Sequence, residues 1–242
     1  HLVKYNDVFV DTLSSACEIA EKGSNLVTIG ITPNYPETGY GYIKYNEEKP
    51  EGKSFTVDSF VEKPDLDTAK KYLESGNYLW NSGMFIWKLS TINECYEKFL
   101  PEMYSSLNEI EKSIGTASED ETLNSIFPDL ENISIDYGVM EKSDNIYIIP
   151  GNFGWDDVGS WLAVSRVNET DSDENIIRGN VVSLDVKNCI IEGSDKLIAA
   201  AGIEDLIVVD SGDALLIIPK EKAGDIKKLL AKMRENGMEK YL

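Results

Sequence analysis

The sequence predicts an α/β fold over residues 1–168, followed by a linker, a small β-helix-like domain and a terminal helix over residues 169–242. Stretches with helical and strand-like spacing of apolar residues alternate up to about residue 166. From residue 180, short strand-like runs follow one another at near-regular spacing. A narrow apolar stripe at helical spacing then precedes Gly237. With 42% hydrophobic residues, the 242-residue chain can bury a substantial core.

Glycine, proline and capping residues set the element boundaries of the first domain. Gly23 follows an amphipathic stretch as a stop, and after Pro64 either Asp65 or Asp67 can cap a helix that ends near Gly76. The predicted helices are 7–22, about 65–76, a helical excursion over 90–129 in which a proline begins a second segment, and 161–167. The predicted strands are 25–31, 40–45, 55–61, 84–87 and 146–149, with a turn at 47–52.

The second region reads as a stack of short strands that each bury one side against a neighbour. Its terminal helix has a narrow apolar stripe, which suits docking or an oligomer contact better than a membrane. The predicted strands are 181–186, 189–191, 197–201, 206–209 and 215–218, and the helix stripe consists of Ile226, Leu229, Leu230 and Met233.

Charge and cysteine usage exclude several classes of function. The formal net charge of −20 would repel a polyanion, so we expect no nucleic-acid partner. No apolar run approaches membrane-spanning length, and nothing in the sequence resembles a signal peptide. The cysteines Cys17, Cys95 and Cys189 are scattered, so we expect reduced thiols, a cytoplasmic protein and no zinc site.

Two polar segments suit a ligand that is rich in hydroxyls at one end and anionic at the other, such as a sugar phosphate. Glu62 can accept hydrogen bonds from sugar hydroxyls, and Lys63 can hold a phosphate as a point charge. Farther along, Asn81 can both donate and accept, and Gly83 lets the backbone approach the ring. Taken alone, a Glu-Lys pair before a proline is more often a surface ion pair at a turn.

A loop with adjacent carboxylates, Asp156 and Asp157, lies between Trp155 and Gly159. Carboxylate oxygens are the ligands that magnesium takes, and adjacent side chains diverge, so at most one of the two is expected to face a metal. The alternative is that these aspartates cap the helix that follows.

These segments together resemble the sugar-1-phosphate nucleotidylyltransferases, most closely the mannose-1-phosphate guanylyltransferases. The resemblance covers nearly the whole chain and rests on six stretches: Thr38-Gly39-Tyr40-Gly41-Tyr42, Val61-Glu62-Lys63-Pro64, Asn81-Ser82-Gly83, residues 134–142, residues 154–161 and Asp213-Ala214-Leu215-Leu216. It implies a Rossmann-like nucleotidyltransferase domain and a left-handed β-helix. The family pattern Trp-x-Asp-x-Gly selects Asp157 as the metal ligand, and Gly41 becomes a candidate for backbone contact with the sugar.

One part of the family pattern has no counterpart in these residues. Family members begin with a loop of the type Gly-Gly-x-Gly-x-Arg-Leu-x-Pro-Leu, and their first metal-binding aspartate would fall just before His1. The resemblance therefore implies that the nucleotidyltransferase domain is incomplete, with residues 1–168 as its C-terminal part. We expect the chain alone to be inactive, and uncovered apolar sheet surface to favour association.

The function implied by the resemblance is nucleotidyl transfer from GTP to mannose 1-phosphate with Mg²⁺, giving GDP-mannose and pyrophosphate. Lys63 and Asp157 would be the catalytic residues, Asp157 as the metal ligand, and Gly41, Glu62, Lys63, Asn81 and Gly83 would bind the sugar phosphate. A homo-oligomer is a possibility. Two alternatives stay open: another sugar-1-phosphate nucleotidylyltransferase, or a non-catalytic sugar-phosphate-binding or assembly fragment.

Overall fold

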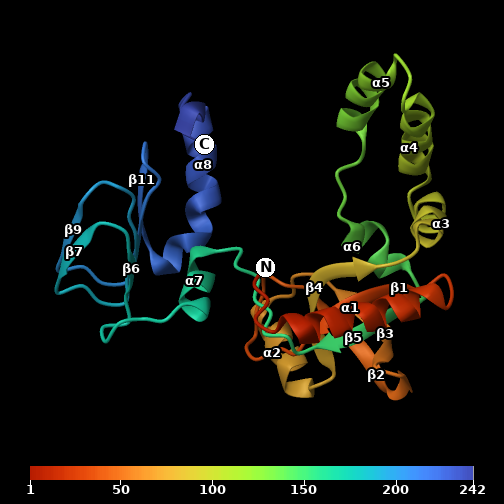
Figure 1. The fold of residues 1–242 in the computed structure, drawn as a ribbon, viewed down its shortest axis with the longest axis horizontal. Helices are drawn as coiled ribbons and strands as arrows, with labels where there is room; N and C mark the ends of the chain where they lie inside the picture. Colours follow the sequence, from red (N-terminus) through yellow and green to blue (C-terminus); the bar gives the residue numbers. More distant parts are fainter. Residues whose placement is uncertain (242) are drawn as a thin grey trace. The chain divides into compact units, whose positions relative to one another are not determined.

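A computed structural model describes residues 1–241 of the chain, apart from the side chains at positions 49 and 51. The chain forms two compact units, which we describe separately (Figure 1). The barrel unit is Val3–Trp155, and the β-helix unit combines His1–Leu2 with the chain from Asp156 onward. The two compact units thus meet in the chain after Trp155. The domain boundary at residue 168 stays a prediction. Residue 242 lies outside the described residues.

The barrel unit is built on a closed sheet of five strands in the order β1-β4-β2-β3-β5. Strand β1 is parallel to β5 and antiparallel to β4, and the remaining neighbours pair antiparallel. All six residues of β1 are buried because it lies between β4 and β5. The strands are β1 (Leu26–Ile31), β2 (Tyr42–Glu51), β3 (Ser54–Val61), β4 (Tyr78–Ile86) and β5 (Ile146–Gly151).

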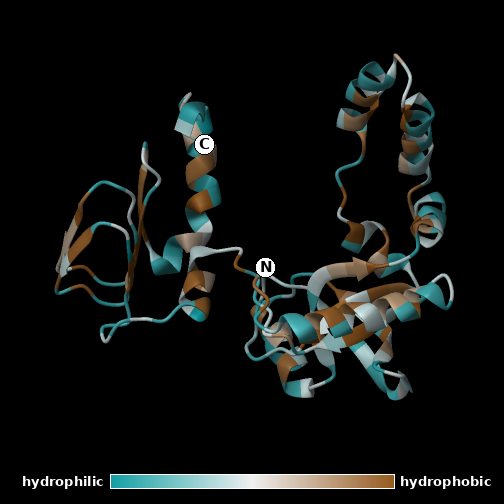
Figure 2. Cartoon of the chain, viewed as in Figure 1, coloured by the Kyte–Doolittle hydropathy of each residue, from teal (hydrophilic) through white to brown (hydrophobic). Residues whose placement is uncertain are grey.

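Helices cover this sheet and extend from it. Helix α1 buries Ala16, Ile19 and Ala20 against Val27 and Ile149 of the sheet, and its apolar and polar residues alternate in Figure 2. A fully buried side chain of the size of Ile19 or Val27 contributes about 1.5–3 kcal/mol. Helices α4 and α5 run side by side away from the sheet (Figure 1). The helices are α1 (Asn6–Glu21), α2 (Leu66–Ser75), α3 (Leu89–Phe99), α4 (Pro101–Ser113), α5 (Glu119–Ile126) and α6 (Ile135–Gly138), and 3-10 turns follow at Phe127–Asp129 and Met140–Lys142.

The predicted capping of α2 is confirmed. Asp65 is the N-cap, and its side chain accepts a hydrogen bond from the Thr68 backbone N–H at 2.8 Å. Gly76 ends the helix in the left-handed conformation, with φ of 76°. Between the end of β3 and this cap the chain bends at Lys63, whose φ is 48°.

The β-helix unit confirms the predicted stack of short strands and terminal helix. Strands β6, β8 and β10 are parallel neighbours, β11 closes that sheet antiparallel to β10, and β7 pairs with β9 in parallel. Helix α7 packs Trp161 and Val164 on the cluster around Ile190. The elements are α7 (Trp161–Val167), β6 (Ile176–Arg178), β7 (Val181–Leu184), β8 (Ile190–Glu192), β9 (Ile198–Ala201), β10 (Leu206–Asp210), β11 (Leu215–Pro219), α8 (Ile226–Glu235) and 3-10 turns at Lys220–Asp225 and Glu239–Tyr241.

The structure corrects two predicted boundaries and adds one strand. Strand β2 continues to Glu51, so the predicted turn at 47–52 reduces to Gly52 and Lys53. Strand β4 begins at Tyr78 rather than at residue 84, which places Asn81 and Gly83 inside a strand. Strand β6 lies outside the predicted strands, and it forms by parallel pairing with β8.

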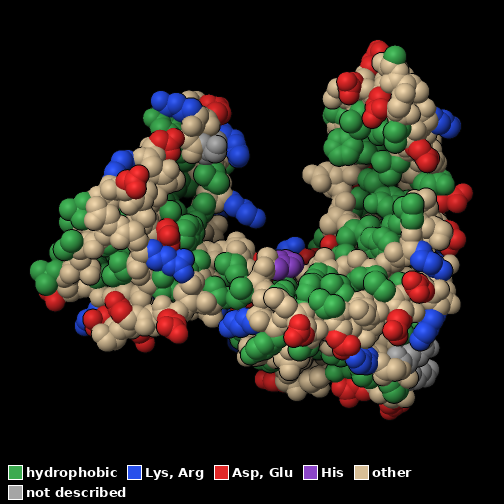
Figure 3. All heavy atoms as spheres, viewed as in Figure 1, with side chains coloured by type: hydrophobic (Ala, Val, Ile, Leu, Met, Phe, Trp, Pro, Cys, Tyr) green, Lys and Arg blue, Asp and Glu red, His purple; other side chains and the backbone are tan. Residues whose placement is uncertain are grey.

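Two further features of the described residues are the distribution of basic side chains and the length of the helices. Lys and Arg side chains are scattered over the face drawn in Figure 3 and do not gather in one patch. No helix within residues 1–241 is both long enough and apolar enough to cross a membrane.

Candidate functional site

The predicted sugar-phosphate residues of the barrel unit meet at one end of three neighbouring strands. Tyr42, which begins β2, is paired with Val61 at the end of β3 and with Trp80 in β4. This register sets Gly41, Glu62 and Asn81 side by side. The Asn81 backbone N–H donates to the Gly41 carbonyl at 2.8 Å, and the Lys63 N–H donates to the Tyr40 carbonyl at 3.3 Å.

An irregularity in β4 positions the amide of Asn81. Thr28 pairs with Phe85 and Gly30 pairs with Asn81, so β4 uses more residues than β1 between these two pairs. The extra residues bulge, with Gly83 in the left-handed conformation at φ of 71°. The Ser82 hydroxyl donates to the Ile29 carbonyl at 2.6 Å and fastens the bulge to β1.

Glu62 is the most unusual side chain of this group because it is charged and only 10% exposed. Its Oε1 atom accepts a hydrogen bond from Lys63 Nζ at 2.7 Å. Its Oε2 atom is buried without a hydrogen-bond partner among the described residues. A buried carboxylate oxygen without a donor is costly, so this atom is a candidate acceptor for a ligand donor that reaches it.

Lys63 differs from its neighbour, because its side chain is 60% exposed. Its backbone has φ of 48°, in the left-handed region that few non-glycine residues adopt. The hydrogen bond to Glu62 raises the pKa of the Lys63 ammonium, and the nearby Tyr137 and Asp136 add to the effect. Lys63 therefore presents a fully protonated ammonium at the surface, where it can meet an anion.

The side chain of Asn81 is already engaged by protein groups. Its Nδ2 donates to Asp136 Oδ1 at 2.9 Å, and its Oδ1 accepts from the Gly83 N–H at 3.1 Å. The structure therefore brings Gly83 to the Asn81 side chain. Asn81 in turn holds Asp136, a residue of α6 that is 55 positions away in the chain.

Two acidic residues of this site were missed by the sequence reasoning, Asp136 and Glu141. Glu141 follows α6 in a 3-10 turn that packs on β3. Partial burial raises the pKa of the Glu141 carboxyl, the negative charges of Glu62 and Asp136 raise it further, and a hydrogen bond from the Glu62 backbone partly offsets these effects. The stretch 134–142 was noted only as a family match, and its carboxylates were the available signal.

In the β-helix unit, Asp156 and Asp157 have different surroundings. Both carboxylate oxygens of Asp156 accept hydrogen bonds from Arg166, each at 2.9 Å. Asp157 is 38% exposed, and its Oδ1 atom lies 3.9 Å from the His1 imidazole. The predicted alternative of an aspartate N-cap is wrong, because Ser160 occupies the N-cap of α7.

The carboxylate of Asp157 is a type of ligand that magnesium binds. A partly exposed oxygen ligand suits this cation, which typically takes one or two protein carboxylates together with substrate phosphates. Within residues 1–241 no group of three or more His, Cys, Asp or Glu side chains forms a cage that could hold a metal by itself. Asp157 could therefore hold the ion only in a shared arrangement.

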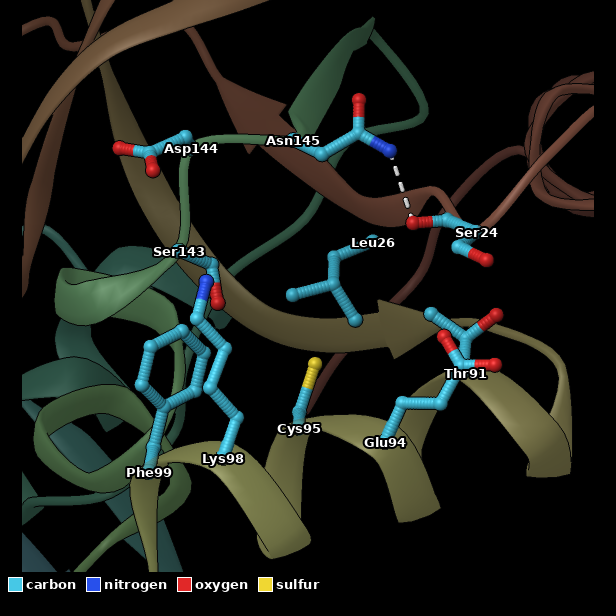
Figure 4. Close-up of a pocket in the computed structure, with 10 residues that line it drawn as sticks. All are labelled: Ser24, Leu26, Thr91, Glu94, Cys95, Lys98, Phe99, Ser143, Asp144 and Asn145. Carbon is cyan, nitrogen blue, oxygen red and sulfur yellow. Dashed lines mark hydrogen bonds between the residues drawn. The ribbon is translucent and has the colours of Figure 1, made fainter.

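A separate cavity of about 200 Å³ lies where β1 and β5 begin, beside α3 (Figure 4). Asn145 Nδ2 donates to the Ser24 carbonyl at 2.7 Å along its rim. Burial raises the pKa of the Cys95 thiol, which makes it a poor nucleophile at neutral pH. The cavity contains none of the predicted site residues, and those of the barrel unit lie toward the other end of β1 beside Gly30.

Comparisons with known proteins agree with this architecture. The nucleotidyl transferase family model matches residues 2–174, and the model of the MannoseP isomerase/GMP-like beta-helix domain matches residues 179–233. A mannose-1-phosphate guanylyltransferase of Salmonella montevideo is 39% identical over an alignment of 243 positions, which covers 97% of this chain and 50% of that protein. The alginate biosynthesis protein AlgA of Pseudomonas syringae pv. tomato is 38% identical over 240 residues, 98% of this chain and 49% of that protein.

A solved structure has a similar fold. The crystal structure described as mannose-1-phosphate geranyltransferase from Thermus thermophilus superposes with a TM-score of 0.80 and 33% identity, covering 96% of this chain and 67% of that one. The chain spans about half the length of the curated relatives it matches. On the match over residues 2–174, together with the β-helix that follows, the chain belongs to the nucleotidyl transferase family.

Proposed function

We propose that this chain supplies the sugar-phosphate site of an enzyme that transfers a guanylyl group from GTP to mannose 1-phosphate, giving GDP-mannose and pyrophosphate. The observation that carries the proposal is the buried Oε2 atom of Glu62, which has no donor among the described residues and lies beside a lysine able to bind phosphate. The names of the relatives support the choice of mannose 1-phosphate and of GTP.

In the proposed reaction the phosphate oxygen of the sugar attacks the α-phosphorus of GTP, while the bond to the departing pyrophosphate breaks. Such a transfer needs positioning and charge neutralisation rather than a protein nucleophile. Glu62 would accept a hydrogen bond from a sugar hydroxyl, and Gly41, which has no side chain, lets the Glu62 carboxylate lie against the backbone there. Lys63 would neutralise the 1-phosphate, which lowers its repulsion from the triphosphate.

We propose Asp157 as the ligand of Mg²⁺, which when bound would neutralise phosphate charge. The bidentate pairing of Asp156 with Arg166 supports this choice between the two neighbours. A cytoplasmic location and a homo-oligomeric state belong to the same proposal. Three free cysteines are compatible with a reducing compartment.

The test is calorimetric titration of the chain with mannose 1-phosphate, mannose and inorganic phosphate. We expect mannose 1-phosphate to bind more tightly than either part. Replacement of Glu62 by Gln should weaken binding by about 1–3 kcal/mol, because one charge-assisted hydrogen bond is lost. Glu74→Gln, at an exposed position of α2, is the matched control and should leave binding unchanged. Absence of mannose 1-phosphate binding by the unaltered chain would overturn the proposed function.

A further inference from the structure

Three carboxylates and one ammonium converge beside the proposed sugar-phosphate site. Glu62 accepts a hydrogen bond from Lys63, and Asp136 accepts one from Asn81. The negative charges of Glu62 and Asp136 raise the pKa of Glu141. The three acids come from different parts of the barrel unit, namely the end of β3, α6 and the 3-10 turn after α6. The proposed roles of Glu62 and Lys63 leave Asp136 and Glu141 unused.

Asp136 is held in a fixed orientation but keeps capacity to bind a ligand. Its Oδ1 atom accepts a hydrogen bond from Asn81 at 2.9 Å, and a carboxylate can accept further hydrogen bonds at its other oxygen. Both side-chain groups of Asn81 are used, one for Asp136 and the other for Gly83, so the amide cannot rotate without losing a bond. Asn81 is thus a positioning residue for Asp136.

The charge balance limits what can lie against these groups. An ionised carboxylate accepts hydrogen bonds and cannot donate them. If a phosphate joins Glu62 in neutralising Lys63, the negative charges of Asp136 and Glu141 would remain uncompensated beside the site. A sugar must therefore present donors here, and a second negative charge on its ring would be repelled.

We propose that Asp136 is a specificity-determining residue that selects sugar 1-phosphates by charge. It accepts a hydrogen bond from a ring substituent, admits neutral hexose 1-phosphates and amino-sugar 1-phosphates with a protonated amine, and excludes hexuronic acid 1-phosphates. Glu141 strengthens the exclusion through its charge. The inference rests on the proposed sugar-phosphate site and names the class of sugar that this site takes.

The experiment compares binding of three ligands to the chain at pH 7: mannose 1-phosphate, 2-amino-2-deoxymannose 1-phosphate and mannuronic acid 1-phosphate. The unaltered chain should bind the amino sugar at least as tightly as mannose 1-phosphate, and the uronic acid about tenfold or more weakly. In Asp136→Asn the preference for the amino sugar over the uronic acid should fall by about tenfold or more. Asp129→Asn, which removes an exposed charge elsewhere, should keep the unaltered preference.

Glu141→Gln provides a second variant that keeps the test decisive should Asp136→Asn fail to fold. Glu141 is exposed as a residue, so its replacement should fold, and it should improve relative binding of the uronic acid by a smaller factor. If both folded variants keep the preference of the unaltered chain, or if Asp136→Asn weakens all three ligands equally, the inference is overturned. Failure of the unaltered chain to bind mannose 1-phosphate would instead overturn the proposed function.

Discussion

The Oε2 atom of Glu62 rests against the backbone of Gly41 so closely that a Cβ atom added to Gly41 would come nearer to it than 3.0 Å. Real Cβ atoms do not show such a separation. The same added atom would lie 3.2 Å from the Cβ of Asn81, so it could not move toward that side instead. Glycine at position 41 is therefore what allows a carboxylate to be buried at the end of β3.

Gly41→Ala should weaken binding of mannose 1-phosphate by about tenfold or more, because the new methyl group displaces the Glu62 carboxylate. Gly39→Ala is the matched control two residues earlier, where an added Cβ would meet the Glu37 Oε1 atom at 3.2 Å, within a side chain that can move aside. Calorimetric titration of both variants checks the expectation. Equal affinity of the two variants would show that the position of Glu62 does not determine binding.

Lys63→Ala should weaken binding of mannose 1-phosphate by about tenfold or more and leave binding of mannose unchanged, because only the phosphate needs the ammonium. Lys63→Arg should recover part of the loss, since a planar fork replaces a compact charge imperfectly. Lys53→Ala is a close control: Lys53 is 62% exposed and pairs with Asp11 at 2.6 Å. A loss of mannose affinity in Lys63→Ala would contradict the assignment of Lys63 to the phosphate.

Asp157→Asn should lose metal binding, whereas Asp156→Asn should lose thermal stability. With Mn²⁺ as a paramagnetic substitute for Mg²⁺ and mannose 1-phosphate present, backbone NMR signals near residue 157 should broaden in the unaltered chain and not in Asp157→Asn. Asp156→Asn should keep the broadening and lower the melting temperature, because it weakens a bidentate pair with Arg166. Equal broadening in the unaltered chain and Asp157→Asn would remove Asp157 from the metal site.

Asp210 should give the β-helix unit an acid-sensitive stability. The Ser194 hydroxyl, then the Gly212 N–H, and then Lys196 at 4.0 Å lower the pKa of the Asp210 carboxyl below its ordinary value of 3.8. Because the folded pKa is lowered, the stabilisation is present above pH 3.8 and is lost as the pH falls further toward the folded pKa.

Thermal unfolding followed by circular dichroism at several pH values checks this expectation. Asp210→Asn should melt below the unaltered chain at pH 7, and the difference should shrink below about pH 3.8. Asp195→Asn, at an exposed position near Ser194, should melt like the unaltered chain throughout. A difference between Asp210→Asn and the unaltered chain that does not change with pH would show that shape, not charge, explains the effect.

Local signals in the sequence were sufficient for most elements, and they failed where pairing with distant residues decides the structure. Asp65 and Gly76 marked the ends of α2 because capping is a property of neighbouring residues. The start of β4 was placed six residues late, since Tyr78–Gly83 becomes strand only by pairing with β1 and β2. Sequence patterns carry little information about such partners.

The candidate site shows the same limit. Glu62, Lys63 and Asn81 could be proposed from their residue types and order, and the structure places them together. Asp136 could not, because its importance depends on a hydrogen bond to an amide 55 residues away. The assignments of Gly41, Glu62, Lys63 and Asp157 to sugar phosphate and metal remain predictions that the variants above test. The assignments of Asn81 and Gly83 to the sugar phosphate remain predictions as well.

Closure of the β1-β4-β2-β3-β5 ring affects how the barrel unit meets other chains. Each of these strands has two neighbours, so the ring offers no unpaired edge onto which a foreign strand could add. In the β-helix unit, β6 and β11 end one sheet, and β7 and β9 each pair on one side only. Exposed Leu215 and Ile217 lie on β11. Self-association through strand addition would therefore begin in the β-helix unit, and charged substitutions at Leu215 or Ile217 are the natural means of suppressing it.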